Sequence, residues 1–260
     1  MRHLTFLLVS IVVIAMSIIG DASAAPDAQE LLRRSDAIRN PGKQFKVQVQ
    51  LAEFDGGKQV DASTLQSYSR EQESSGQFAS LVAFVQPARD AGKLMLRNGD
   101  DLWFFDPSTK ASIRLSPQQR LMGQASNGDV VTVNLAKDYS AKLLAEEQVT
   151  DGERKPRKAY KLGLTATAAA ATYSTIEYWI DVENSRPIKG LFYAESGRLL
   201  KTVFYRKYQP QLGKDRPTEL VIIDGLKPQS VTLMRFGEFS IPNIPSTWFN
   251  RDFLPRFQLE

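Results

Sequence analysis

The feature that most constrains the fold is a long succession of strand-like segments joined by short turns. Apolar and polar residues alternate from Phe45 to Leu51, and this period of two predicts a half-buried strand. Further on, Asn98-Gly99-Asp100 separates two apolar runs and predicts a tight hairpin. Segments of this kind recur roughly ten or eleven times, and the short turns between them indicate antiparallel neighbours.

A meander of this length cannot remain flat, because neighbouring strands rotate by roughly 20–25° relative to each other. It has to close into a barrel or curl around something. The pattern from Pro26 to Arg39 predicts one amphipathic helix ahead of the strands. We therefore predict a single mainly β (α+β) domain, residues 25–260, built as an incomplete antiparallel barrel capped by helices. A fully packed β-barrel core that holds no ligand is the alternative.

The segment 118–137 carries conflicting signals. Val130 to Val133 favour a strand because three of these four residues are valine and the fourth is threonine. Ser126 or Asn127 can cap a helix, and the apolar residues that follow also have usable helical spacing. The residues of this segment leave both structures open.

Residues 1–24 have the pattern of a secretory signal peptide. Arg2 supplies a positive charge, an apolar run follows from Phe6 to Ile19, and Ala22-Ser23-Ala24 provides small residues for cleavage. An uncleaved membrane anchor is the alternative, but the run is shorter than the ~20 residues that span a bilayer. We expect cleavage near Ala24 and export to the periplasm.

Composition excludes most catalytic chemistry. The chain has no cysteine, and its one histidine, His3, leaves with the signal peptide. Nucleophilic triads, imidazole acid–base catalysis and His or Cys zinc sites are therefore excluded. The carboxylate pairs Asp100/Asp101 and Glu146/Glu147 lie in a predicted turn and on opposite faces of a predicted strand. We predict no catalytic residue, no metal site and no cofactor.

Two segments have an open role. The run Glu153–Lys158 is the densest basic stretch, and it is either a solvated hairpin loop or a docking patch for an anionic partner. The tail 241–260 carries Trp248, Phe249 and Phe253 after the last predicted strand. It either completes the core or docks a partner. The net charge of +4 is modest, and we expect no nucleic-acid partner and a monomer.

The central stretch resembles a known family. The matching residues are Leu121-Met122-Gly123-Gln124, Gly128-Asp129, Asp138-Tyr139, Tyr178-Trp179-Ile180-Asp181, Arg186-Pro187, Gly197 and Leu200-Lys201. Together they look like the bacterial outer-membrane lipoprotein-sorting proteins related to the periplasmic carrier LolA. The resemblance covers about Phe45 to Phe239. It implies an unclosed antiparallel barrel of about eleven strands, with a helical lid after Ser116 that covers the concave face.

The resemblance also implies a function. Such proteins bind acyl chains of lipoproteins or other lipids in an apolar cavity and shuttle them between the inner and outer membrane without catalysis. An inner-membrane exporter and an outer-membrane acceptor are the partners that this role implies. The alternative is an accessory interaction module, without cargo of its own, in an envelope lipid-export complex of the resistance–nodulation–division type.

The candidate ligand-binding residues are large apolar or aromatic side chains on the predicted strands and the predicted lid. Met122 and Met234 suit a surface that adapts to variable acyl chains. For each residue, simple core packing is the alternative to a place in the cavity. The predicted cavity residues are Trp103, Phe105, Met122, Tyr178, Ile180, Leu191, Tyr193, Phe204 and Met234.

Overall fold

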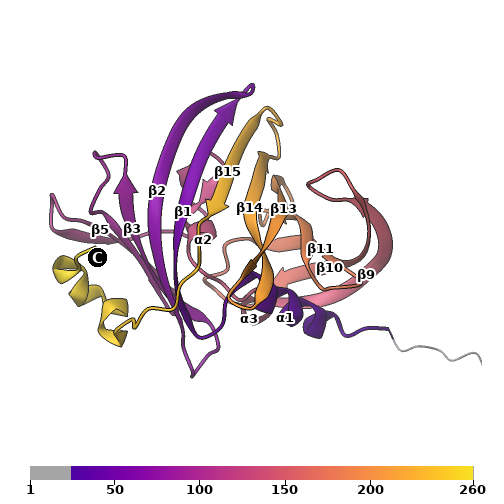
Figure 1. Ribbon diagram of the computed structural model, residues 1–260, viewed down its shortest axis with the longest axis horizontal. Helices are drawn as coiled ribbons and strands as arrows, with labels where there is room; N and C mark the ends of the chain where they lie inside the picture. Colours follow the sequence, from indigo (N-terminus) through magenta and orange to yellow (C-terminus); the bar gives the residue numbers. More distant parts are fainter. Residues whose placement is uncertain (1–24, 260) are drawn as a thin grey trace, which may run out of the picture.

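One antiparallel sheet of thirteen strands organises the molecule and does not close on itself (Figure 1). The computed structural model describes residues 25–259, so the predicted signal peptide, residues 1–24, lies outside the described residues. The strands of this sheet are β1 (Gln44–Asp55), β2 (Lys58–Glu71), β3 (Phe78–Gln86), β4 (Leu94–Asn98), β5 (Asp101–Asp106), β6 (Ala111–Arg114), β9 (Tyr139–Thr150), β10 (Pro156–Ala166), β11 (Thr175–Asp181), β12 (Pro187–Tyr193), β13 (Leu199–Gln211), β14 (Lys214–Asp224) and β15 (Ser230–Phe236).

The strand order joins the two halves of the chain in the middle of the sheet. It runs β6-β5-β4-β3-β2-β1-β15-β14-β13-β12-β11-β10-β9, so the first and last strands of the meander pair with each other. The edges β6 and β9 are consecutive strands of this sheet in the sequence, and the segment between them connects the two ends of the curled sheet. We call residues 116–138 the lid segment.

The lid segment is only partly helical. It contains a two-stranded ribbon of β7 (Arg120–Met122) and β8 (Ala125–Ser126) and two single-turn helices, α2 (Asn127–Val130) and α3 (Leu135–Asp138). Between the helices the chain is extended, as the backbone angles of Val131 show. The prediction of a helical lid is therefore wrong in detail, because valine and threonine keep their preference for extended backbone here.

Helix α1 (Ala28–Arg39) covers the same face of the sheet as the lid segment. The side chain of Asp27 caps its first turn by accepting the backbone N–H of Gln29 and Glu30. Leu31 and Leu32 are buried against the sheet. We call the face that carries α1 and the lid segment the inner face, and the opposite one the outer face.

The prediction of a mainly β, unclosed antiparallel sheet is confirmed, but the number of strands is larger than about eleven. Residues 25–259 form fifteen strands. The ribbon β7–β8 accounts for part of the difference, because segments of two or three residues carry too little periodicity to be recognised.

The tail folds back over the outer face. Its 3₁₀ helices η1 (Ser246–Phe249) and η2 (Arg251–Arg256) pack on β3, β4 and β5 (Figure 1). Ile244, Phe249 and Leu254 are buried there in an apolar cluster with residues of these strands. The tail therefore completes a second, outer part of the core.

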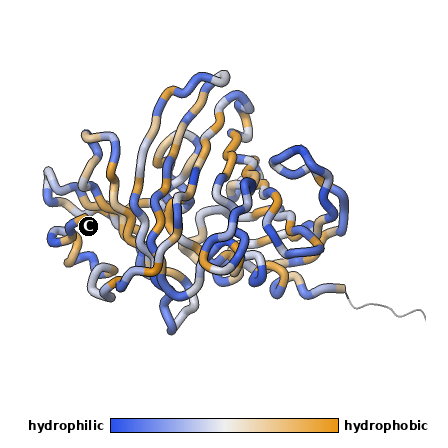
Figure 2. The backbone as a smooth tube through the Cα atoms, viewed as in Figure 1, coloured by the Kyte–Doolittle hydropathy of each residue, from blue (hydrophilic) through white to orange (hydrophobic). Residues whose placement is uncertain are grey.

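The basic run Glu153–Lys158 forms the hairpin between β9 and β10. Asp151 accepts the backbone N–H of Glu153 and Lys155, which fixes the turn. The tip of this hairpin is hydrophilic (Figure 2). These contacts fix the conformation of the turn, and a docking role for the basic run stays a prediction.

No helix among residues 25–259 is long and apolar enough to cross a membrane.

Candidate functional site

The inner face encloses a small cavity between the sheet and the lid segment. Its volume is about 80 Å³, whereas ligand pockets usually have roughly 300–1,000 Å³. Val131, Val133 and Leu135 of the lid segment form one wall. In this conformation the lid side chains fill most of the interior, so a ligand of ordinary size requires the lid segment to move. The remaining lining residues are Arg39, Gly128, Asp129, Asp138, Tyr139, Thr172, Tyr173, Phe192, Val203, Tyr205, Leu220 and Ile222.

A buried ion pair holds α2 to the sheet. Lys201 of β13 is 3% exposed and pairs with the carboxylate of Asp129 in α2. The Lys201 ammonium also lies 4.8 Å from the ring centre of Tyr173. Asp129 accepts two further hydrogen bonds, from the Tyr173 hydroxyl at 2.7 Å and from the Ser126 backbone N–H at 2.7 Å. Burial lowers the pKa of Lys201, and the charge of Asp129 acts against that shift.

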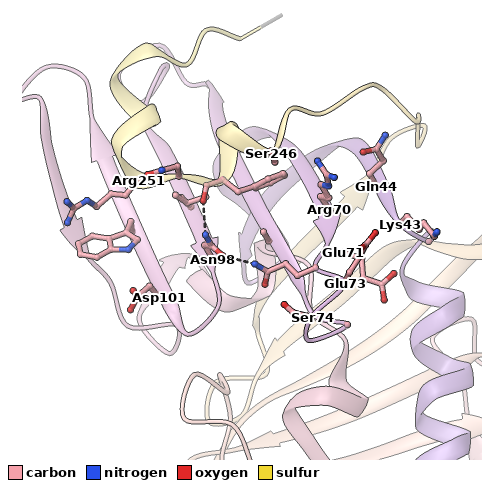
Figure 3. Close-up of a pocket in the computed structure, with 18 of the residues that line it drawn as sticks. Lys43, Gln44, Arg70, Glu71, Glu73, Ser74, Asn98, Asp101, Ser246 and Arg251 are labelled. Atoms are coloured by element: carbon pink, nitrogen blue, oxygen red, sulfur yellow. Dashed lines mark hydrogen bonds between the residues drawn. The ribbon is translucent and has the colours of Figure 1, made fainter.

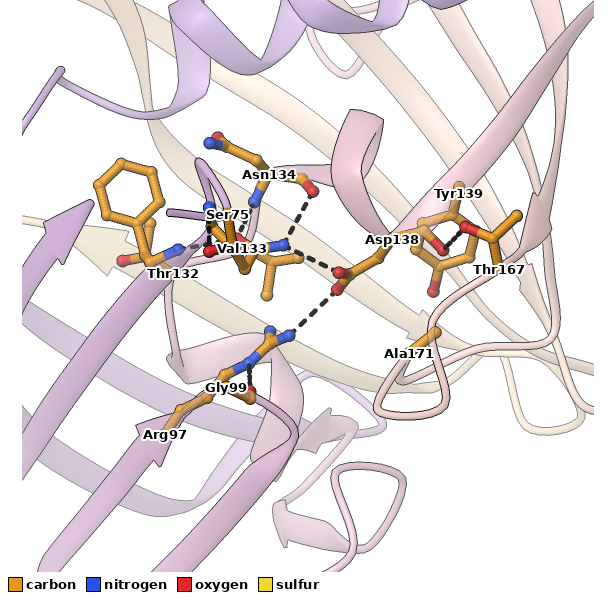
Figure 4. A network of polar contacts seen from close by, with 12 residues as sticks. Ser75, Arg97, Gly99, Thr132, Val133, Asn134, Asp138, Tyr139, Thr167 and Ala171 are labelled. Carbon is orange, nitrogen blue, oxygen red and sulfur yellow. Dashed lines mark hydrogen bonds and ion pairs between the residues drawn. The ribbon is translucent and has the colours of Figure 1, made fainter. Parts of the chain in front are cut away.

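A second buried ion pair holds the end of α3 (Figure 4). Arg97 of β4 donates to Asp138 at 3.1 Å, and both side chains are 7% exposed. Gln77 donates to the other carboxylate oxygen of Asp138 at 2.9 Å. The Asp138 carboxylate is therefore held by donors from the β2–β3 turn and from β4.

The third contact region lies at the end of α1. The Arg39 guanidinium donates to the Val133 carbonyl at 2.9 Å. Asp36 accepts the backbone N–H of Ala136 at 2.8 Å and forms an ion pair with Arg39. Burial raises the pKa of Asp36, while Arg39 and the Ala136 N–H act against it. Helix α1 is thereby hydrogen-bonded to α3 and to the extended chain just before it.

Two kinds of interaction hold the lid segment on the inner face. Apolar side chains of the lid face the inner core, while a few directional polar contacts fix its position. Apolar contacts tolerate exchange of one apolar neighbour for another, because the hydrophobic effect is non-directional. Ion pairs and hydrogen bonds require one geometry. An apolar ligand can therefore replace the lid side chains inside the sheet while the polar contacts define a closed state.

The nine predicted cavity residues divide between the two faces. Tyr178, Ile180 and Met234 belong to the inner core, and Met122, a residue of the lid segment, packs against it. Their part in ligand binding remains a prediction.

The other five predicted residues lie on the outer face. Trp103 and Phe105 belong to the cluster under the tail, and Leu191 packs in a small cluster around Trp179. The Tyr193 hydroxyl donates to Glu177 at 3.2 Å on the outer side of β11. Phe204 alternates with the inner residues Val203 and Tyr205 and lies beside the β9–β10 hairpin. Strand alternation separates these residues from their neighbours, but the predicted faces are the wrong way round on β5, β12 and β13.

Sequence reasoning missed the charged residues of the interior. Lys201, Asp129 and Asp138 belong to the segments that carry the family resemblance, yet none was assigned a role. One signal was available at Lys201. It occupies the same strand face as Val203 and Tyr205, and a charge at an apolar position of an alternating strand indicates a buried partner.

All three tryptophans of the chain lie on the outer face. Trp103 and Trp248 belong to the cluster of the tail. Trp179 lies between the ammonium groups of Lys161 and Lys189, which are 4.9 and 4.3 Å from its ring centre. The aromatic residues that line the inner cavity are tyrosines and Phe192.

The residues that the structure describes contain no cluster of three or more acidic, histidine or cysteine side chains able to hold a metal ion. The buried carboxylates of the inner face are occupied by Lys201, Arg97 and Arg39. The site thus combines an apolar interior with buried ion pairs at the lid segment.

Known proteins share this architecture. A family model described as "Uncharacterized protein" matches residues 76–256. A LolA superfamily protein from Nitrosomonas europaea is 35% identical in sequence, and its crystal structure matches with a TM-score of 0.78 over 88% of this chain and 100% of that chain.

Two more distant structures share the fold. One is described as an outer membrane lipoprotein-sorting protein domain from Vibrio parahaemolyticus, at 19% identity, a TM-score of 0.74, and coverage of 88% of this chain and 98% of that chain. The other is a DUF1329 family protein from Desulfovibrio piger, at 21% identity, a TM-score of 0.73, and coverage of 87% and 97% respectively. Among curated proteins, none matches the sequence significantly.

Proposed function

Because the chain belongs to the LolA superfamily, we propose that it is a non-catalytic carrier that binds acyl chains of lipoproteins or lipids on its inner face. In this proposal it is exported to the periplasm as a single domain, residues 25–260, and moves its cargo between the inner and outer membrane. The observation that carries the proposal is the apolar inner face closed by a lid whose position depends on a few polar contacts.

The inner face supplies the binding energy. Phe192, Val203 and Ile222 line the cavity and are at most 5% exposed, and burial of apolar surface is worth roughly 25 cal/mol per Å². In the closed state, lid residues such as Val131 and Leu135 cover this surface. An acyl chain that takes their place covers the same apolar surface. The free energy gained when the acyl chain binds therefore offsets the free energy lost when the lid opens.

The polar contacts fix one position of the lid segment on the sheet in the closed state. When the lid moves away, Lys201 and Asp138 lose partners but gain water, which lowers the cost of opening. A protein of this kind binds cargo without a large net change in free energy, which suits a carrier that must also release it.

The test compares two substitutions on one strand with opposite orientations. Ile222 lines the cavity, whereas its neighbour Val221 faces the outer side of β14. We expect Ile222→Trp to reduce binding of a fluorescent long-chain fatty acid at least tenfold, and Val221→Trp to leave it unchanged. Both variants are first checked for wild-type circular dichroism.

Native mass spectrometry of gently extracted protein provides a second readout. We expect adducts of lipid mass on the wild type and fewer on Ile222→Trp. A protein that binds no fatty acid and carries no lipid would contradict the proposal. Unchanged lipid traffic in cells that carry Ile222→Trp would instead favour an interaction module without cargo.

A further inference from the structure

A large hollow lies outside the barrel, beneath the tail (Figure 3). It has a volume of about 1660 Å³, which exceeds the roughly 300–1,000 Å³ of ordinary small-molecule pockets. The tail forms one wall, and the ends of β2, β4 and β5 form the others. We call it the outer groove. Most of its lining residues are polar, so it does not suit an acyl chain.

The outer groove and the inner cavity approach each other at one end of the sheet. Gly76 lines the groove, and its carbonyl accepts the side-chain N–H of Asn134 at 2.7 Å. The neighbours of Asn134 on both sides, Val133 and Leu135, line the inner cavity. In the same way, Arg39 lines the cavity and Pro41 lines the groove. Only the residues at the rim formed by the end of α1, the β2–β3 turn and the lid segment therefore separate the two spaces.

The groove offers charges of both signs near this rim. Lys43 and Arg70 provide cations, and Glu71 and Glu73 provide anions (Figure 3). Among residues 25–259, none of these four side chains forms an ion pair, although Arg70 donates to the Ile244 carbonyl at 3.3 Å. A surface with unpaired charges of both signs matches a partner that also carries both signs.

The aromatic residues of the groove are already engaged. The Arg251 guanidinium lies 5.0 Å from the ring centre of Trp103, and Phe249 is 5% exposed. Sugar recognition needs open aromatic faces, and an anionic membrane surface needs an excess of cations. A polypeptide with charged and polar side chains fits the groove better than either.

We propose that the outer groove binds the polypeptide segment that follows the acylated residue of a lipoprotein cargo, while the acyl chains occupy the inner cavity. The inference rests on the proposed function, because it assigns the acylated end of the same ligand to the inner face. The shared rim allows one amphiphilic molecule to occupy both spaces.

The experiment uses four ligands on the full mature chain, of which the fourth is phosphatidylglycerol. The first is a synthetic lipopeptide whose diacylated cysteine is followed by ten residues that include lysine and glutamate. The second has the same acyl group followed by serine and glycine only, and the third is a fluorescent fatty acid. Binding is measured by competition and by fluorescence anisotropy at low salt, because charge pairing at a surface is weakened by salt.

Two groove variants each give all four of these side chains near the rim a charge of the same sign. One carries Lys43→Glu with Arg70→Glu, and the other carries Glu71→Lys with Glu73→Lys. We expect each to weaken binding of the charged lipopeptide about tenfold and to leave fatty-acid binding unchanged. The effect should be absent for the serine–glycine lipopeptide.

Matched controls change the same charges elsewhere on the surface. Lys58→Glu with Lys227→Glu, and Glu183→Lys with Glu195→Lys, alter exposed residues that do not line the groove. We expect both control proteins to bind the charged lipopeptide like the wild type.

Each outcome separates the two proposals. Equal weakening for the serine–glycine lipopeptide, or for phosphatidylglycerol in place of a lipopeptide, would overturn the assignment to a polypeptide. Unchanged binding of the charged lipopeptide by both groove variants would overturn the role of the groove and leave the acyl-carrier function standing. If neither the fatty acid nor any lipopeptide binds, both the proposed function and the assignment of the groove are contradicted.

Discussion

Arg97 of β4 and Asp138 at the end of α3 form an ion pair of 3.1 Å that links the two ends of an open sheet. Asp138 directly precedes the edge strand β9, whereas β4 lies near the opposite edge. No backbone hydrogen bond between β6 and β9 closes the sheet. Two buried side chains, assisted by Gln77, therefore connect the two halves across the interior.

We expect removal of one partner of this pair to destabilise the protein strongly. Arg97→Met leaves the Asp138 carboxylate buried without its cation, and such a loss typically costs about 3–5 kcal/mol. The double variant Arg97→Met with Asp138→Leu should recover much of this loss because no buried charge remains. Urea unfolding at neutral pH measures both.

The surface pair Arg114–Asp101 is the control for this prediction. Its side chains are 62% and 44% exposed, so Arg114→Met should cost less than about 1 kcal/mol. Equal losses of unfolding free energy in Arg97→Met and Arg114→Met would contradict a larger contribution of the buried pair.

We expect Lys201→Met to loosen the lid segment more than the sheet. Asp129 keeps the Tyr173 hydroxyl and the Ser126 N–H but loses its cation. A hydrogen bond between charged groups contributes about 1.5–3 kcal/mol, so amide exchange in residues 124–133 should accelerate roughly tenfold or more. Hydrogen exchange with mass spectrometry detects the change.

Lys142→Met removes an exposed lysine of β9 and serves as the control. It should leave the exchange of the lid segment unchanged. Wild-type exchange of residues 124–133 in Lys201→Met would show that apolar packing alone holds the lid.

We expect Leu254→Ala to destabilise the protein without affecting acyl binding. Leu254 is 1% exposed in the cluster between the tail and the outer face, and a buried leucine truncated to alanine costs about 2–5 kcal/mol. Leu259, which is 46% exposed, should tolerate the same change within about 0.5 kcal/mol. Chemical unfolding and fatty-acid titration are measured on the same samples, and a selective loss of acyl binding would contradict the separation of the two faces.

The lowered pKa of Glu219 allows the pH dependence of the stability of the fold to be predicted. Burial alone would raise the pKa of Glu219, but hydrogen bonds from Arg235, Arg206 and Lys207 lower it below the ordinary value of 4.5. The folded state is therefore stabilised by the carboxylate above pH 4.5, and this contribution is lost as the pH falls through the lowered pKa.

We expect Glu219→Gln to reduce stability near neutral pH and to make it depend less on pH below 4.5. Guanidinium unfolding across this range measures both effects. The same acid sensitivity in the variant and the wild type would assign the pH dependence to other carboxylates.

The sequence allowed the meander to be predicted because alternation and turn residues are local. The hairpin at Asn98–Asp100 and the helix that begins after Asp27 are both present in the structure. Alternation also separates Trp103 and Phe105 from Phe104, since Phe104 packs on the inner core.

The face to which each set belongs could not be predicted from the same pattern. A strand between two apolar clusters has large side chains on both sides, and β5 is such a strand. Which side is inner depends on the tail, whose docking on β3, β4 and β5 involves residues more than a hundred positions away. The pairing of Lys201 with Asp129 is likewise a long-range contact that no local pattern contains.

The position of the tryptophans has a practical consequence for spectroscopy. Trp103, Trp179 and Trp248 all lie on the outer face. Their intrinsic fluorescence will therefore report the docking of the tail and changes around Trp179, and will respond little to changes in the interior. A tryptophan introduced in place of Phe192, which lines the cavity, would give the inner face an emission of its own.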